Sequence, residues 1–249
     1  MIRLIRIFTN IFLCFIVRAY HKIEKMTEKE LKAQQQYLLN LKIIERKTKK
    51  PLIFGLIGLV GSGKTSVAKE LAPLIGATIV EGDKIRVELR KQNEKYEGAR
   101  KIAENIAEKI IENGGNVVFD SDHIDSKKRA SLKEKAKKFG AKVIFIRVYS
   151  DFDVMIGRIV NNVYKENQED FFGGAHTVWE GVNRGAVVKD REMICRMLSH
   201  YKAVYNGNSR YKFVIKKLPF NIFAEVDTTK ENKWKQEVKM IAGQIRSRY

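Results

Sequence analysis

Residues 58–65 of the chain read GLVGSGKT and fit the pattern G-x-x-x-x-G-K-[ST] at every defined position. An apolar run precedes the pattern and an amphipathic stretch follows it, which is the strand–loop–helix context that a phosphate-binding loop requires. The glycines allow the backbone to turn tightly, so that successive N–H groups converge on phosphate oxygens at a helix N-terminus. We expect a nucleoside triphosphate to contact Gly58, Leu59, Val60, Gly61, Ser62, Gly63, Lys64, Thr65 and Ser66.

Two side chains of this loop have chemistry of their own. Lys64 supplies a mobile positive charge for the β- and γ-phosphate oxygens, and Thr65 offers a hydroxyl to Mg²⁺. A second Mg²⁺ ligand is expected at Asp120, because NVVFD ends an apolar run with a carboxylate. Asp122, two residues further on, is more typical of a turn residue.

Asp83 and Arg86 lie three residues apart, just beyond the apolar run ATIV at 77–80. Ligands of open parallel sheets collect outside the carboxyl ends of the strands, so both residues are expected beside the phosphate-binding loop. A carboxylate there can take the proton of an attacking hydroxyl, and an Arg can bind an acceptor's phosphate bidentately. The alternative is that Asp83 caps a helix that begins at Lys84. The two roles are compatible.

Short apolar runs alternate with helical stretches from Pro51 onward. A strand–helix alternation of this kind predicts a parallel sheet covered on both faces. The predicted strands are 52–58, 77–80, 116–120, 142–148 and 222–226. The clearest helices are 97–113, with apolar residues at three- and four-residue spacing, and 126–139.

The N-terminal part is predicted to be an extension of this domain. Residues 26–50 contain a predicted helix over 27–47 that starts with a capping box, Thr27 and Glu30. Residues 1–25 form a basic apolar leader without acidic residues near its start, and its apolar run is shorter than the roughly 20 residues that a membrane-spanning helix needs. The leader is a targeting segment, a membrane-surface segment or a stretch upstream of a true start at Met26.

The composition favours anionic partners, because 48 Lys and Arg against 29 Asp and Glu give the chain a net charge of +19. Nucleotides, nucleic acid and a lipid surface all fit this charge. Cys14 and Cys195 lie far apart, which argues against a disulfide scaffold and fits a reducing compartment. We therefore expect a cytoplasmic protein, or a membrane-associated or organellar one if residues 1–25 are genuine.

The order of these motifs resembles that of P-loop kinases. The resemblance rests on the phosphate-binding loop and on the segments GDKIR, FDSDHIDSKKR and VYSDFDVMIGR, within roughly residues 51–160. The chain is similar to the AAA-type predicted kinases, a group that includes polynucleotide kinase, zeta toxin and adenylylsulfate kinase. The resemblance implies a three-layer α/β P-loop NTPase fold for residues 51–249, with Asp83 as base and Arg86 holding the acceptor. It also matches Arg129 to an Arg in the helix after the third strand, and Arg158 to the Arg near the nucleotide that opens the lid.

The resemblance implies an ATP-dependent kinase that uses Mg²⁺ and transfers the γ-phosphoryl group to a hydroxyl or phosphate acceptor. The acceptor is a small molecule or a nucleic-acid end. ATP is favoured over GTP because no N-K-x-D motif occurs. An adenylylsulfate acceptor is in doubt, since NNVYKEN and FFGGAH match that family's motifs only in distorted form.

Two other functions are compatible with the same loop. One is an NTPase that uses hydrolysis as a conformational switch on nucleic acid or membrane, and the other is a nucleotide-gated binding protein. Asp83 with Arg86 favours a kinase over both. The lid is expected at about residues 158–200, where the candidate phosphate clamps are Arg184, Lys189, Arg191 and Arg196.

Overall fold

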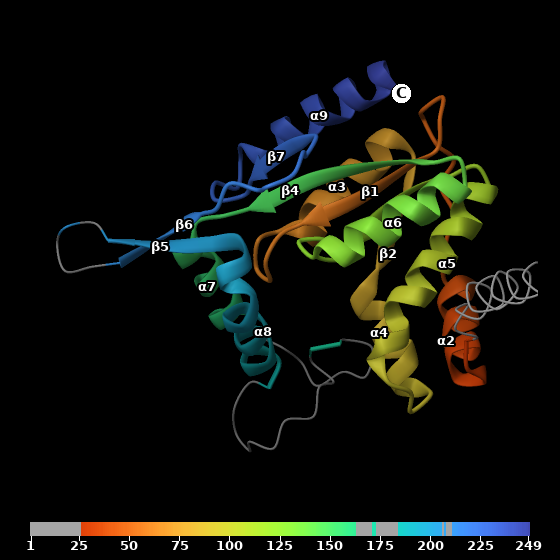
Figure 1. Ribbon diagram of the computed structural model, residues 1–249, viewed down its shortest axis with the longest axis horizontal. Helices are drawn as coiled ribbons and strands as arrows, with labels where there is room; N and C mark the ends of the chain where they lie inside the picture. The colour runs from red at the N-terminus through yellow and green to blue at the C-terminus, as the bar shows by residue number, and fades with distance from the viewer. Residues whose placement is uncertain (1–25, 163–170, 173–183, 206, 208–210) are drawn as a thin grey trace, which may run out of the picture.

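The computed structural model describes residues 26–162, 171–172, 184–205, 207 and 211–249, with the backbone alone for residues 184–188 (Figure 1). The leader at residues 1–25 and most of the lid between residues 163 and 183 therefore lie outside the described residues. No helix of the described residues is long and apolar enough to cross a membrane.

The centre of the molecule is a five-stranded sheet with the strand order β2-β3-β1-β4-β7, and all four strand pairs are parallel. Its strands are β1 (Leu52–Ile57), β2 (Ala77–Glu81), β3 (Asn116–Asp120), β4 (Lys142–Tyr149) and β7 (Ala224–Asp227). The predicted five-stranded parallel sheet is confirmed. All residues of β1 are buried, which is typical of a central strand covered on both faces.

Helices cover the sheet on both faces (Figure 1). One apolar core joins Leu52, Phe54 and Leu56 of β1 to two helices, α3 (Lys64–Ile75) and α9 (Trp234–Arg248). The other core joins Ile53 and Ile57 of the same strand to the remaining helices of the main layer. These are α2 (Glu28–Leu39), α4 (Gly82–Lys91), α5 (Ala99–Glu112, after a 3₁₀ turn at Tyr96–Gly98) and α6 (Ser126–Lys138).

The capping box of α2 is confirmed, but the predicted length of this helix is wrong. Glu30 N–H donates to Thr27 Oγ1, and Thr27 N–H donates to the Glu30 carboxylate. The helix ends at Leu39 rather than at residue 47, and Leu39 is 78% exposed. The chain beyond it follows the edge of the sheet instead, where Ile44 N–H donates to Thr78 Oγ1 of β2.

A smaller unit outside these three layers contains a hairpin that the sequence does not predict. Helices α7 (Phe152–Val160) and α8 (Arg184–His200) pack against an antiparallel hairpin of β5 (Tyr201–Tyr205) and β6 (Tyr211–Ile215). In Figure 1 the hairpin extends away from the main sheet. Tyr201 anchors its base, because this buried side chain donates its hydroxyl to the Ser150 carbonyl at the end of β4.

Candidate functional site

A cavity of about 420 Å³ lies at the carboxyl ends of β1 and β3. It brings together the three groups of residues that the sequence singled out, namely the phosphate-binding loop, the Asp83–Arg86 pair and Asp120. Nearly all predicted nucleotide-binding residues line it, and Ser62 is the exception because it is buried beneath the loop. The lining residues of that set are Gly58, Leu59, Val60, Gly61, Gly63, Lys64, Thr65, Ser66 and Arg158.

The loop has the backbone shape that phosphate binding requires. Gly61 and Gly63 have φ angles of 81° and 88°, in the left-handed region that favours glycine. At Gly58 a side chain would collide with the Val148 carbonyl oxygen. Lys64, at the start of α3, folds back over the loop and donates to the Leu59 carbonyl oxygen at 2.9 Å. Its ammonium group therefore lies where the loop faces the cavity.

Thr65 and Asp120, the two predicted Mg²⁺ ligands, both line this cavity and lie next to each other. The Thr65 side chain forms a hydrogen bond with the Asp120 carboxylate. Burial raises the pKa of Asp120, and Thr65 and the nearby Lys64 charge oppose this shift. A hydroxyl and a carboxylate are hard oxygen ligands, so the pair fits Mg²⁺, which fills its remaining positions with water and phosphate oxygens. Among the described residues no group of three or more His, Cys, Asp and Glu side chains forms a fuller metal site.

Asp83 and Arg86 form the wall of the cavity that α4 contributes. Arg86 Nη1 donates to Asp83 Oδ1 at 2.6 Å, and both side chains are partly exposed to the cavity. Arg86 also lies over the Phe171 ring, 5.5 Å from its centroid. The N-cap of α4 is Glu81, and no side chain caps this helix, so the alternative in which Asp83 is a helix cap is wrong.

Arg158 holds the loop from the α7 side. It donates to the Gly61 carbonyl at 3.2 Å and to Thr228 Oγ1 at 2.9 Å, while Thr228 Oγ1 donates to the Ser62 carbonyl at 2.8 Å. The predicted position of Arg158 beside the loop therefore agrees with the geometry. Thr228, which follows β7, was missed because a single Thr after a strand carries no distinguishing pattern.

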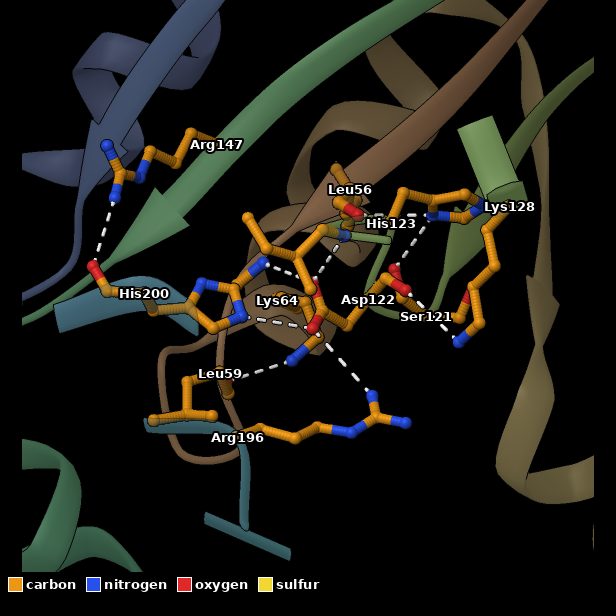
Figure 2. Close-up of polar contacts among 12 residues, drawn as sticks. Leu56, Leu59, Lys64, Ser121, Asp122, His123, Lys128, Arg147, Arg196 and His200 are labelled. Atoms are coloured by element: carbon orange, nitrogen blue, oxygen red, sulfur yellow. Dashed lines mark hydrogen bonds and ion pairs between the residues drawn. The ribbon is translucent and has the colours of Figure 1, made fainter. Parts of the chain in front are cut away.

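Asp122 is more than the turn residue that its sequence position indicates (Figure 2). It does accept the N–H of Ile124, but the same Oδ1 accepts the N–H of Gly58, the first loop glycine, at 3.2 Å. His200, at the end of α8, donates from Nε2 to Asp122 Oδ2 at 3.0 Å. Both side chains are buried. Burial alone raises the pKa of Asp122, but His200, Lys64 and the Gly58 N–H outweigh it and lower this pKa to about 2.

The candidate phosphate clamps separate into two groups. Lys189 and Arg196 line the cavity, whereas Arg191 does not, and the side chain of Arg184 lies outside the described residues. Lys189 lies over the ring of the buried Phe172, 4.6 Å from its centroid. Arg196 reaches Asp122 at 3.7 Å.

The basic run SKKR contains Arg129, the residue that the resemblance matches to an Arg in the helix after the third strand. Lys128 lines the nucleotide cavity and Arg129 does not. Arg129 instead donates to the carbonyls of His123 and Ile124, and its guanidinium lies 3.5 Å from the centroid of the Phe220 ring. The one-residue difference follows from helix geometry, because neighbouring residues of α6 point about 100° apart.

Comparisons with known proteins agree with this architecture. Residues 53–176 match the family model of an AAA domain. A protein named APE1195 is 19% identical in sequence, with 83% of this chain aligned to 98% of that one at a TM-score of 0.51. A putative kinase from Chloroflexus aurantiacus is 16% identical, with 81% of this chain aligned to all of that one at a TM-score of 0.51. No curated protein sequence matches the chain.

The parallel sheet, the loop between β1 and α3 and the covering helices thus agree with both comparisons. The chain shares the fold of these two structures, a parallel sheet covered by helices on both faces, and its residues 53–176 match an AAA domain.

Proposed function

We propose that this protein is an ATP-dependent kinase that transfers the γ-phosphoryl group to a hydroxyl or phosphate acceptor. The observation that carries the proposal is the position of Asp83 and Arg86 on the same cavity as Lys64, Thr65 and Asp120. A protein that only binds the nucleotide has no need for a carboxylate and a guanidinium opposite its phosphate-binding loop. A hydrolysing enzyme can use the same pair to orient water, so the assay below compares transfer to an acceptor with transfer to water.

The loop side of the cavity supports binding of ATP with Mg²⁺. The loop N–H groups and Lys64 offer positive charge to the β- and γ-phosphates, and phosphoryl transfer depends mainly on such positioning and charge stabilisation. Thr65 and Asp120 would hold Mg²⁺, which neutralises charge on the phosphates when it is bound. Arg158 holds the backbone of the loop in place.

The α4 side of the cavity supports the acceptor role. Arg86 engages Oδ1 of Asp83, which leaves Oδ2 of the same carboxylate for the hydroxyl of an acceptor. Asp83 would orient that hydroxyl and take its proton as the new O–P bond forms, while the bond from the γ-phosphorus to the bridging oxygen of ADP breaks and ADP leaves. Arg86 both fixes the carboxylate and presents a guanidinium to an anionic acceptor.

The test is transfer of the labelled γ-phosphate of ATP in the presence of Mg²⁺. The acceptors would be sugars, nucleosides, 5′-hydroxyl DNA and RNA ends and adenylylsulfate, with water alone as a separate reaction. We expect label on one acceptor class, and Asp83→Asn should lower this transfer by about a hundredfold or more while ATP binding is retained. Asp153→Asn is the matched control, because Asp153 is an exposed Asp in the first turn of α7 and lies outside the cavity.

Release of free phosphate at the same rate by the wild type and by Asp83→Asn, with no labelled acceptor, would contradict the proposal. That result would favour a hydrolysing switch on nucleic acid or membrane. Adding DNA, RNA or anionic vesicles to the same assay would then identify what stimulates the hydrolysis.

A further inference from the structure

A second and larger cavity, of about 730 Å³, adjoins the nucleotide cavity. Its walls come from the start of α6, the end of α8 and the segment 216–220 that follows β6. Its volume is within the range of small-molecule sites, about 300–1,000 Å³. Asp122, Lys128 and Arg196 line both cavities, so a ligand in the larger one reaches the side of the phosphate-binding loop.

The lining of this second cavity is strongly basic. Five basic residues face two acidic ones, Asp122 and Asp125. The five are Lys128, Arg129, Arg196, Lys216 and Lys217. Both acids already have partners, because Asp122 binds His200 and Gly58, and Asp125 caps α6 by accepting the N–H of Lys128 at 3.0 Å. Even with both acids ionised, the lining keeps an excess of three positive charges, five bases less two acids.

Three of the basic side chains remain available to a ligand. Lys128 makes a long contact of 3.5 Å with the Asp122 carbonyl, and Arg196 is 47% exposed at 3.7 Å from the Asp122 carboxylate (Figure 2). Within the described part of the chain, exposed Lys217 has no hydrogen bond or ion pair. Burial lowers the pKa of Lys128, and the positive charges of Arg196 and Arg86 lower it further. Positive charge is thus crowded here in a way that a bound anion would relieve.

The rest of the lining suits an organic ligand rather than a bare ion. Leu218, Pro219 and Phe220 give the cavity an apolar side, and the Arg129 guanidinium lies over the Phe220 ring. Arg129 also donates to two backbone carbonyls, and Lys216 Nζ donates to the Leu198 carbonyl, so both are held in place at the cavity wall. A site with fixed cations and an apolar side matches a phosphate ester with a small organic part.

We propose that this cavity binds the phosphate group of the acceptor, and hence that the acceptor of the phosphoryl transfer is itself a phosphate ester. This inference rests on the proposed kinase function. The acceptor's phosphate would lie against Lys128, Arg196 and Lys217, and the rest of the molecule would extend past Asp122 toward the nucleotide.

Binding is measured first, because it does not depend on transfer. With the nucleotide cavity saturated by Mg²⁺ and a non-hydrolysable ATP analogue, inorganic phosphate, glycerol 3-phosphate and glycerol are titrated calorimetrically. We expect both phosphates to bind at millimolar concentrations and glycerol not to bind. Lys217→Glu should weaken phosphate binding about tenfold, the equivalent of one charge contact, whereas Lys212→Glu should leave it unchanged. Lys212 is the matched control, an exposed Lys of β6 outside the cavity.

Ser199→Glu tests the same cavity from α8. Ser199 is exposed and lines the second cavity but not the nucleotide cavity, so the new carboxylate should weaken phosphate binding and leave binding of the ATP analogue and thermal unfolding unchanged. Failure of either phosphate to bind the wild type would overturn the inference. Equal weakening by Lys217→Glu and Lys212→Glu would also overturn it, because the effect would then be one of overall charge.

The transfer assay separates this inference from the kinase proposal. Comparison of each acceptor with its phosphorylated form should show a lower KM for the phosphorylated one, and Lys217→Glu should raise KM for that form alone. Transfer with equal KM to both forms would support the kinase proposal and contradict the inference that the acceptor is a phosphate ester. Phosphate binding at this cavity without any transfer would remove the kinase proposal, and with it the acceptor role, while the anion site itself would stand.

Discussion

The phosphate-binding loop is supported on its two sides by different chemistry. On the α7–β7 side, Arg158 and Thr228 bind the carbonyls of Gly61 and Ser62. Neither of these side chains is a carboxylate or an imidazole, so we expect this support to be the same at pH 4 and at pH 7. On the α8 side, a carboxylate, Asp122, binds the loop N–H of Gly58, and it is itself bound by His200.

This difference between the two sides indicates that the loop is sensitive to a change of charge on the α8 side, at Asp122. The bonds on the α7–β7 side join Arg158 and the Thr228 hydroxyl to backbone carbonyls and to each other, and no carboxylate takes part in them. The partners of Asp122 favour its ionised form and lower its pKa to about 2, although its burial acts in the opposite direction. Loss of one partner on this side therefore leaves a buried charge or a buried unpaired donor, and both are costly.

The largest effect is expected for Asp122→Ala. The substitution leaves the buried His200 ring nitrogen and the Gly58 N–H without their acceptor, and breaking a buried pair of this kind costs about 3–5 kcal/mol. Urea denaturation near neutral pH measures the loss. Asp125→Ala, which removes the exposed N-cap of α6, is the control and should cost about 1 kcal/mol. A loss at Asp122 no larger than that at Asp125 would show that the two sides of the loop do not differ.

The acid dependence of stability is the second way to test the difference. The folded pKa of Asp122 lies at about 2, below its ordinary value of 3.8, so its contribution is present above pH 4 and is lost as the pH falls toward 2. The shift corresponds to about 2 kcal/mol. Asp122→Asn cannot titrate, so the stability difference between the wild type and this variant should shrink by that amount between pH 6 and the acid limit. Denaturation at a series of pH values checks this, and a constant difference would contradict the lowered pKa.

Asp120 provides an internal contrast in the same experiment. Its pKa is raised by burial, so its effect has the opposite sign, and stability contributed by its protonated form is lost as the pH rises through its folded pKa. Asp120→Asn should therefore change the acid profile in the opposite direction to Asp122→Asn.

The smallest effect is expected for Thr228→Val on the other side of the loop. Val keeps the shape of the side chain but removes the donor to the Ser62 carbonyl and the acceptor for Arg158, while Arg158 keeps its bonds to the Gly61 and Thr228 carbonyls. A loss of about 1 kcal/mol is expected, and it should not vary between pH 4 and pH 7. The same denaturation series measures it. If Thr228→Val lowered the free energy of unfolding as much as Asp122→Ala does, the two sides of the loop would not differ in their contribution to stability.

Much of the fold could be predicted because its central strands are buried on both faces. Such strands are continuous apolar runs, and their bounds agree with the structure to within two residues, as at Leu52–Ile57 and Asn116–Asp120. The periodic helix predicted at 97–113 was found at Ala99–Glu112 for a similar reason, since its apolar face is wholly buried. The predicted end of α2 was wrong because Leu41 and Ile44 keep a helical spacing while the chain packs along the sheet edge.

The loop side of the site could be predicted and the α8 side could not. The loop is a contiguous motif, so its geometry depends on neighbouring residues. Asp122 and His200 lie 78 residues apart, and no spacing rule relates them. The exposed strands β5 and β6 lack a buried face along most of their length, which removes the alternation that reveals a strand. The contact of Lys128 with the nucleotide cavity could not be predicted either, because the sequence does not show which side of α6 faces that cavity.

The position of His200 has a mechanical consequence. It is the last residue of α8, its carbonyl accepts the N–H of Lys216 beyond β6, and its ring holds Asp122 against Gly58. His200 therefore connects α8, the β5–β6 hairpin and the phosphate-binding loop. A rotation of α8 that preserves these bonds would displace the first glycine of that loop, so a movement of this part of the lid, or of the hairpin joined to it, would change the nucleotide site.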